Sequence, residues 1–388
     1  MIDRYRNFRT VAAVGIALGL AAFLLALPPF TIRTTIVPIV LGTGALALGL
    51  AALSQGERRL GGFAIGVGFL GTIGGLWAQG VDEDTLGAVL TGGLLASTLR
   101  FATPLAYAAM GGIFSERSGV VNIGLEGMML IGAFFAVWGS VWSGSWVVGV
   151  ATAMLSGGLL ALVHAVFSIH LRADQIVSGF AVNLLALGLT GYLYSSIYPE
   201  GTTKGQVKRV PSLENAFDFL GWVPGSDLSL LVWLMFLVVI LSYVVLFKTP
   251  IGLRIRSVGE HPRAADTVGI SVYGIRYAAV ITSGVLAALG GAFLSIGFTG
   301  RFTENMTGGR GYIALAAVIF GKWRPGWAFV ATLLFGFGFA LAIPLQREAD
   351  ISSNVISTLP YVLTLIAVAG VIGRSIPPAA VGRPYVKQ

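Results

Sequence analysis

The sequence predicts an all-α protein, a polytopic bundle of transmembrane helices. Hydrophobic residues fill 55% of the 388 positions and charged residues only 11%, whereas soluble domains carry about 25% charged residues. The apolar residues lie in long runs such as Val11–Leu27 and Leu230–Phe247. A run of about 18 or more apolar residues is typical of a membrane-spanning helix. The 54 glycines fit the same fold, because small residues let helices approach closely in lipid.

Stretches of sufficient length and hydrophobicity recur along the whole chain. We expect about 12 membrane-inserted segments, at residues 10–27, 35–53, 60–79, 88–113, 122–138, 146–169, 176–195, 229–247, 277–296, 311–321, 327–343 and 355–373. The first follows Arg4, Arg6 and Arg9, as a signal peptide would. Its length and the Pro28-Pro29 pair behind it favour a retained helix instead.

Charged residues predict the orientation of these segments. With the N-terminus inside, the predicted inner loops hold Arg58, Arg59, Arg117, Arg172, Lys248, Arg254, Arg256, Arg263, Arg276, Lys322 and Arg324. The predicted outer loop at 81–85 holds three acidic residues and no basic one. Four arginines fall outside and count against this topology: Arg33, Arg301, Arg310 and Arg347. The positive-inside rule still favours cytoplasmic termini, and it accounts for the formal charge of +8 without nucleic acid as a partner.

Two segments differ from ordinary spans and are expected to be broken or re-entrant. Residues 311–321 would form a helix only about 16 Å long, too short for a hydrocarbon core of about 30 Å. Residues 122–127 are polar and interrupted by glycine at the start of an apolar run. Short or interrupted segments in corresponding places of two halves indicate a transport site. The alternative is a tilted helix together with an ordinary interfacial loop.

Five residues near these segments are candidates for the substrate pathway. Asn122 and Glu126 lie four apart, on one face if the segment is helical, and an ionisable residue inside a membrane segment suggests function. A structural pair with Arg117 or a backbone cap is the alternative for Glu126. Asn183 lies in an apolar helix, where a substrate contact competes with an interhelical hydrogen bond. Phe302 and Tyr312 offer rings on which a planar ring of a solute could stack.

The largest predicted inner loop contains a short amphipathic helix. Pro262 is placed like a first helical residue and Gly269 like a stop signal. Helical spacing puts Ala264, Ala265 and Val268 on one side. A helix of two turns is not stable alone, so it needs a partner surface such as a groove on another subunit. A basic loop on anionic lipid is the alternative. The residues assigned to this partner-binding segment are Gly259, Glu260, His261, Pro262, Arg263, Ala264, Ala265, Asp266 and Gly269.

Several kinds of chemistry are excluded by the sequence. The chain has no cysteine and only three histidines, none paired at metal-ligand spacing. It also lacks the glycine-rich Lys-Ser/Thr loop that binds nucleotide phosphates. We therefore expect a transport subunit that is not an enzyme and holds no metal or cofactor, with its energy supplied by a partner.

Four blocks of the sequence resemble the permease subunits of nucleoside-type ABC importers. They are Thr98–Phe134, Ala173–Gly179 continued by Asn183, Gly259–Ile270 and Gly308–Gly326. The resemblance covers about residues 86–373. The superfamily also contains ribose-type and branched-chain amino-acid permeases, and the stretch Ser-Glu-Arg-Ser-Gly-Val-Val-Asn-Ile-Gly-Leu-Glu-Gly at 115–127 favours the nucleoside branch.

The resemblance implies an assembly around this chain. A cytoplasmic ABC ATPase, carrying ATP and Mg, would dock onto the helix at 259–270. A second homologous permease would complete the pathway, and an extracytoplasmic binding protein or lipoprotein would deliver the nucleoside or similar small polar solute. The chain would lie in the cytoplasmic (inner) membrane of a bacterium or archaeon, with residues 86–373 as the core and 374–388 as a cytoplasmic tail. Residues 1–85 depart from the pattern, as an extension with three transmembrane helices.

Other functions stay open from the residues alone. A permease for simple sugars would belong to the same superfamily. An ion-coupled secondary transporter would need polar ligands near the middle of the membrane, for which Glu126 and Asn183 give thin support. An intramembrane enzyme would need a catalytic dyad or a metal cluster, and the sequence offers no such set.

Overall fold

Helices are the regular secondary structure of the described part of the chain. The computed structural model describes residues 2–25, 36–55, 58–78, 92–198, 207–220, 225–348 and 375–387. Within these ranges there is no β-strand, and only Ser212 and Ser229 form an isolated bridge. The predicted all-α class is therefore confirmed.

Six helices of the described residues are long and apolar enough to cross a membrane. They cover Leu125–Ser143, Trp146–His170, Gln175–Ile197, Leu230–Lys248, Val272–Thr299 and Pro325–Ala342. The segment expected at 355–373 lies outside the described residues. The total of about 12 segments and the cytoplasmic position of both termini stay predictions.

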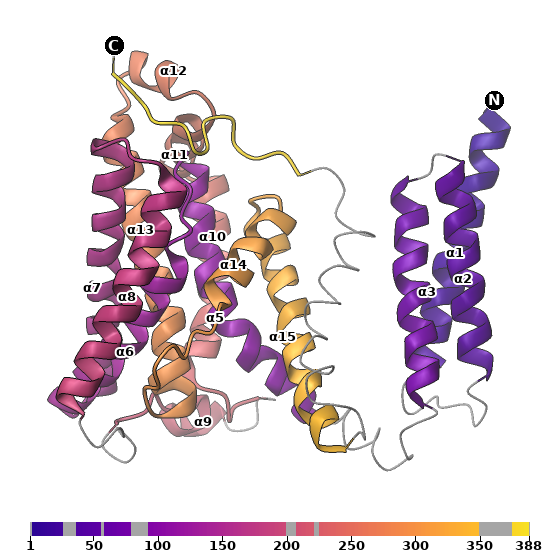
Figure 1. Ribbon diagram of the computed structural model, residues 1–388, viewed down its shortest axis with the longest axis horizontal. Coiled ribbons are helices and arrows are strands. Elements are labelled where there is room, and N and C mark those ends of the chain that lie inside the picture. The colour runs from indigo at the N-terminus through magenta and orange to yellow at the C-terminus, as the bar shows by residue number, and fades with distance from the viewer. Residues whose placement is uncertain are drawn as a thin grey trace. The chain divides into compact units, whose positions relative to one another are not determined.

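The chain divides into two compact units, Met1–Thr98 with Phe337–Ser375, and Leu99–Gly336 with Ile376–Gln388. In the first unit, three N-terminal helices pack against one another (Figure 1): α1 (Ile2–Leu25), α2 (Ile36–Ser54) and α3 (Arg58–Ala78). Glycines allow this close packing, because a Cβ added to Gly19 would lie 2.8 Å from the backbone nitrogen of Gly68. Three helices were expected in this part of the chain.

Two helices form the centre of the second unit. These are α6 (Leu125–Ser143) and α13 (Val272–Ala292), the latter continued by the π-helix η3 (Phe293–Thr299). They contact each other, and 78% of the apolar window of each span is buried. A Cβ on Gly291 would lie 1.9 Å from the carbonyl oxygen of Met129, so only glycine permits this crossing.

The longer helices beside that pair are α5 (Gly92–Arg117, in this unit from Leu99), α7 (Trp146–Ala165) with the π-helix η1 (Val166–His170), α8 (Gln175–Ile197), α10 (Leu230–Lys248), α14 (Arg310–Phe320) and α15 (Pro325–Glu348, in this unit up to Gly336). In α8 and α10 only a third of the apolar window is buried. Their outer faces carry exposed residues such as Phe180, Leu184 and Ile240, as expected for helices that face lipid.

The predicted inner and outer loops lie at opposite ends of the second unit (Figure 1). The largest inner loop forms α11 (Pro250–Glu260) and α12 (Pro262–Thr267), and the C-terminal residues lie at the same end. The loop between α8 (Gln175–Ile197) and α10 (Leu230–Lys248), expected on the outer side, forms α9 (Leu213–Ala216) and the 3₁₀ turn η2 (Asp218–Leu220) at the other end. The helix α10 (Leu230–Lys248) separates these two loops, and which end is cytoplasmic stays a prediction. The outer loop expected at 81–85 lies outside the described residues.

Candidate transport site and coupling surface

The two segments expected to be broken meet in the structure. The carboxylate of Glu126, in the first turn of α6, accepts hydrogen bonds from the backbone N–H groups of Gly309 (2.7 Å) and Gly311 (2.6 Å). These groups belong to the start of α14, where backbone donors have no partner within the helix. A negative charge there is also favoured by the helix dipole, by about 0.3–1 kcal/mol and up to about 2 kcal/mol in partly buried geometry.

Glycines make this capping geometry possible. Gly308 and Gly309 adopt positive φ angles of 50° and 83°, a backbone region that residues with a Cβ avoid. A Cβ on Gly311 would lie 2.4 Å from the backbone nitrogen of Glu126. The Gly-Gly-Arg-Gly sequence therefore serves both the turn and the close approach of α14 to α6.

Asn183 on α8 joins the same junction. Its Oδ1 accepts a hydrogen bond from the backbone N–H of Gly127 (2.7 Å), and its Nδ2 donates to the carbonyl of Ile123 and to the hydroxyl of Tyr312, both at 3.0 Å. The interhelical hydrogen bond considered for Asn183 is therefore present. It fixes the loop before α6 and the first turn of α14 with one side chain.

Asn122 lies fully buried on the other side of that loop. Its Nδ2 donates to the hydroxyl of Ser283 on α13 at 2.9 Å. Its Oδ1 is buried and has no hydrogen-bond partner among the described residues. A buried acceptor without a partner is costly, so this oxygen is available to a water molecule or a polar solute.

The two aromatic candidates occupy different environments. Phe302 is 1% exposed and packs edge-on against Phe134 and Tyr194, at ring-centre distances of 5.3 and 5.2 Å. Tyr312 is 40% exposed. Of the five pathway candidates, three thus meet at one polar junction (Glu126, Asn183 and Tyr312). Asn122 is bonded to Ser283 of α13 instead, and Phe302 lies in the packed interior.

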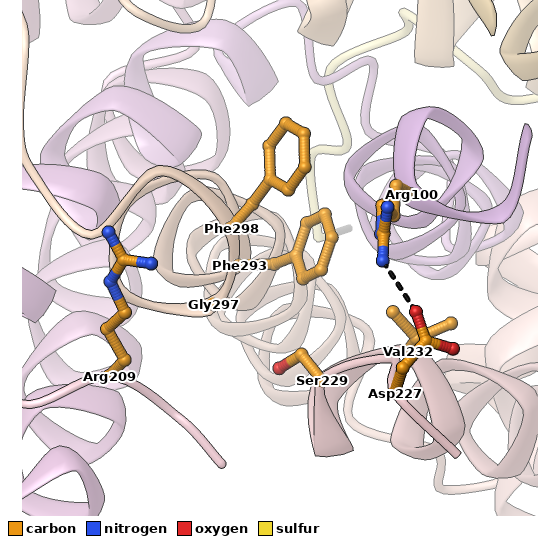
Figure 2. A pocket seen from close by; sticks show the side chains of 8 residues that line it. All are labelled: Arg100, Arg209, Asp227, Ser229, Val232, Phe293, Gly297 and Phe298. Carbon is orange, nitrogen blue, oxygen red and sulfur yellow. Dashed lines mark hydrogen bonds and ion pairs between the residues drawn. The ribbon is translucent and has the colours of Figure 1, made fainter. Parts of the chain in front are cut away.

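A polar recess of about 260 Å³ lies at the end of the unit that carries α9. Figure 2 shows Arg209 on one side of it and Arg100, paired with Asp227 at 2.9 Å, on the other. Phe293 and Phe298 stack between them, with ring centres 6.1 Å apart. Phe298 is 40% exposed, so the recess combines charged groups with an open aromatic face.

The predicted coupling helix forms, with more support than expected. α12 begins at Pro262 and ends before Gly269, whose φ is 83°. It is preceded by α11, a second helix that the sequence analysis did not predict. The side chain of Thr249 accepts a hydrogen bond from Gly252 N–H at the start of α11. A capping threonine followed by proline could have indicated this helix.

The predicted apolar face of α12 is wrong in one respect. Ala264 and Val268 are exposed, but Ala265 is only 3% exposed and packs with Val258, Val272 and Tyr385. The reason is that α12 folds back onto α13 and the C-terminal segment, which the local pattern did not reveal. Ala265 therefore supports the helix from inside, and Ala264 and Val268 are the apolar residues open to a partner.

Sequence reasoning missed a second set of contacts, at the end of α14. There Lys322 and Trp323 have φ angles of 52° and 53°, which is uncommon for residues other than glycine. The indole Nε1 of Trp323 donates a hydrogen bond to the buried carboxylate of Glu116. Burial raises the pKa of Glu116 to about 7, although the indole hydrogen bond acts in the opposite direction.

Arg117 connects this turn to the coupling segment. Its guanidinium donates to the carbonyls of Trp323 (3.0 Å) and Lys322 (3.4 Å) and lies 4.0 Å from the carboxylate of Glu260. Glu260 is the last residue of α11. Arg117 thus contacts both the end of α14 and Glu260. Only His261 separates Glu260 from the start of α12. In the sequence, Arg117 belongs to the Ser-Glu-Arg-Ser stretch at 115–118, part of a block that resembles the permease family.

Comparisons with known proteins find relatives among transport permeases. The family model described as branched-chain amino acid transport system / permease component matches residues 94–368. The guanosine ABC transporter permease protein NupQ of Bacillus subtilis is 44% identical over 311 residues, which is 76% of this chain and 96% of that protein. The nucleoside ABC transporter permease protein NupC of Lactococcus lactis subsp. cremoris is 41% identical over 308 residues, with the same shares.

A more distant relative is the glucose ABC transporter permease protein TsgB13 of Haloferax volcanii, 24% identical over 287 residues, or 71% of this chain and 74% of that protein. No solved structure matches the chain. The family model covers most of the chain, including both ends of α14 and the coupling segment. This chain therefore belongs to the permease-component family of branched-chain amino acid transport systems.

Proposed function

We propose that this chain is the permease subunit of an ATP-driven importer of nucleosides in the cytoplasmic membrane. The observation that carries the substrate class is the 44% and 41% identity to relatives named for guanosine and nucleoside transport. Their match extends over 96% of each relative. The described helices supply six candidate spans for a multi-pass protein.

The polar junction at α14 is our proposed position for the gate. A half-length helix that ends within the membrane is typical of transport sites, and α14 is held there by Glu126 and Asn183. The half-exposed ring of Tyr312 can stack a nucleobase. The free Oδ1 of Asn122 can accept a hydrogen bond from a ribose hydroxyl if the loop opens.

The recess at the opposite end from α12 is our proposed vestibule. Phe302 is buried and its ring cannot stack on a solute in the recess. We assign that stacking to Phe298, which lies beside Arg100 and Arg209. A polar solute released by an extracytoplasmic binding protein would meet this recess before the gate. A second homologous permease would complete the pathway.

Coupling to ATP is assigned to α11 and α12. The cytoplasmic ABC ATPase, which binds ATP and Mg, would dock against the exposed residues of α12. Its movement would pass from Glu260 through Arg117 to the end of α14. This chain would bind no cofactor itself.

Reconstituted uptake tests the proposal. The chain would be co-expressed with the ATPase, second permease and binding protein encoded by neighbouring genes. The purified complex would be placed in liposomes with ATP. We expect accumulation of labelled guanosine that unlabelled nucleosides compete away and that glucose and leucine do not. Uptake of a sugar or an amino acid alone would keep the permease and overturn the substrate. Uptake driven by an ion gradient without ATP would overturn the ATPase coupling.

A sugar is the second candidate, because TsgB13 is named for glucose. The recess would suit a sugar through its charged groups alone. Replacing Phe298 by Leu distinguishes the nucleoside from the sugar. The substitution should raise the KM for a nucleoside by about tenfold, since stacking contributes about 1–3 kcal/mol per base. The KM for a sugar should change little.

A further inference from the structure

The C-terminal residues of the chain form an ordered segment at the coupling end. Residues 376–387 of the second unit contain no helix, yet they lie against α11 and α12 (Figure 1). The backbone N–H of Ala380 donates to the carbonyl of Gly259 at 2.9 Å, and that of Ala379 donates to the carboxylate of Glu260 at 3.1 Å. The segment therefore begins on the two residues that end α11.

Further contacts hold the rest of the segment. Arg276, which is 1% exposed, donates from Nη1 to the carbonyl of Arg383 at 3.1 Å, and Tyr273 donates to the carbonyl of Tyr385 at 3.2 Å. The side chain of Tyr385 is buried beside Ala265 and Val272. The long side chain of Arg276 is thus buried, and it holds a backbone carbonyl of the segment. This indicates that the position of the segment matters for α12.

Between this segment and α12 lies a groove of about 530 Å³. One wall consists of Pro262, Arg263 and Ala264, and the other of Arg383, Pro384 and Val386. Arg263, Ala264, Arg383 and Val386 are exposed. The backbone of Arg383 fixes the segment, and its side chain is left at the groove.

We propose that the C-terminal segment and α12 together form the docking surface for the ATPase subunit. The inference rests on the proposed coupling function. α12 has six residues and is only about 9 Å long, whereas stable interfaces bury about 800 Å² on each partner. The C-terminal segment enlarges that surface directly beside α12 and adds an exposed apolar residue, Val386, to Ala264 and Val268.

The charge of this surface specifies the kind of ATPase face that fits it. Exposed basic side chains stand on both walls of the groove: Arg263 on α12 and Arg383 on the C-terminal segment. The acidic side chains nearby are Glu260, which already accepts the hydrogen bond from Ala379, and the half-buried Asp266. The matching face of the ATPase is therefore an apolar groove with acidic residues along its rim.

Binding of the purified ATPase to the permease complex in nanodiscs tests this proposal. Arg383→Glu should weaken binding by about tenfold, because it places a like charge against an acidic rim. Lys387→Glu is the matched control: it makes the same charge change four residues away, outside the groove, and should change binding less than twofold. Ala264→Arg reports on α12 itself. Thermal unfolding of each variant checks that the permease is folded.

The outcomes separate the two levels of inference. If Ala264→Arg weakens binding and Arg383→Glu does not, the role of the segment is wrong and docking on α12 stands. If neither weakens binding, docking on α12 fails and the proposal fails with it. If Lys387→Glu weakens binding as much as Arg383→Glu, the effect is general electrostatic attraction, and the groove is not the docking site.

Discussion

The two ends of α14 are both held by a buried glutamate, but in different ways. At its start, Glu126 accepts two backbone hydrogen bonds, one on each carboxylate oxygen. At the turn that follows it, Glu116 accepts a hydrogen bond from the indole of Trp323, and burial raises its pKa to about 7. The first contact depends on a charged acceptor and the second does not. The start of α14 is thus fixed by two hydrogen bonds to a charged carboxylate. Its end is joined to the coupling segment through Arg117.

Loss of charge at Glu126 should have the largest effect. In Glu126→Gln the amide group places N–H donors against a backbone N–H donor, so one hydrogen bond is lost. A bond to a charged group contributes about 1.5–3 kcal/mol, which corresponds to roughly a ten- to hundredfold change. We expect ATP-driven guanosine uptake in liposomes to fall by at least about tenfold.

Glu304→Gln is the control for this substitution, because Glu304 is exposed near the same helix. Its uptake should match the unmodified protein. Full activity in Glu126→Gln would mean that the cap is not needed for transport.

A methyl group at Gly311 should act through the same contact. In Gly311→Ala the new Cβ would lie 2.4 Å from the backbone nitrogen of Glu126, so α14 must shift away from α6. We expect uptake to fall several-fold, with protein still present in the membrane. Gly326→Ala is a suitable control, since a Cβ there meets nothing within 4 Å. Equal uptake in both variants would show that this close approach is not required.

Local signals predicted the all-α class and the two broken segments that meet at the polar junction. The short length of 311–321 and the glycines of 122–127 indicated two broken segments, and these segments meet through Glu126. The pairing itself could not be predicted, because it joins residues 183 to 185 positions apart through tertiary packing. The same reason explains the error at Ala265: helical spacing identified an apolar face, but the C-terminal segment that covers part of it lies far along the chain.

The connection between the end of α14 and the coupling segment should give a smaller effect. Arg117→Ala removes the hydrogen bonds to the carbonyls of Trp323 and Lys322 and the ion pair with Glu260. We expect ATP hydrolysis to continue while guanosine transported per ATP falls by about three- to tenfold. Arg254→Ala, an exposed arginine on α11, should leave that ratio unchanged. A normal ratio in Arg117→Ala would exclude this residue from coupling.

The last predicted change concerns the pH dependence of stability and not transport, and it depends on Glu116. Its pKa is about 4.5 without the fold and about 7 when buried, so the folded protein holds the proton more tightly. Its contribution to stability is therefore greatest below about pH 4.5, falls as the pH rises to about 7, and is then constant. The difference corresponds to roughly 3 kcal/mol at most.

Glu116→Gln keeps an oxygen that can accept the indole hydrogen bond and removes the titration. Thermal unfolding of the purified permease between pH 5 and pH 8 should thus show a flatter dependence in this variant, with the gain in stability near pH 8. Glu304→Gln, an exposed carboxylate, should keep the slope of the unmodified protein. An unchanged slope in Glu116→Gln would mean that Glu116 does not titrate in this range, and the contrast between the two ends of α14 would then be geometric and not electrostatic.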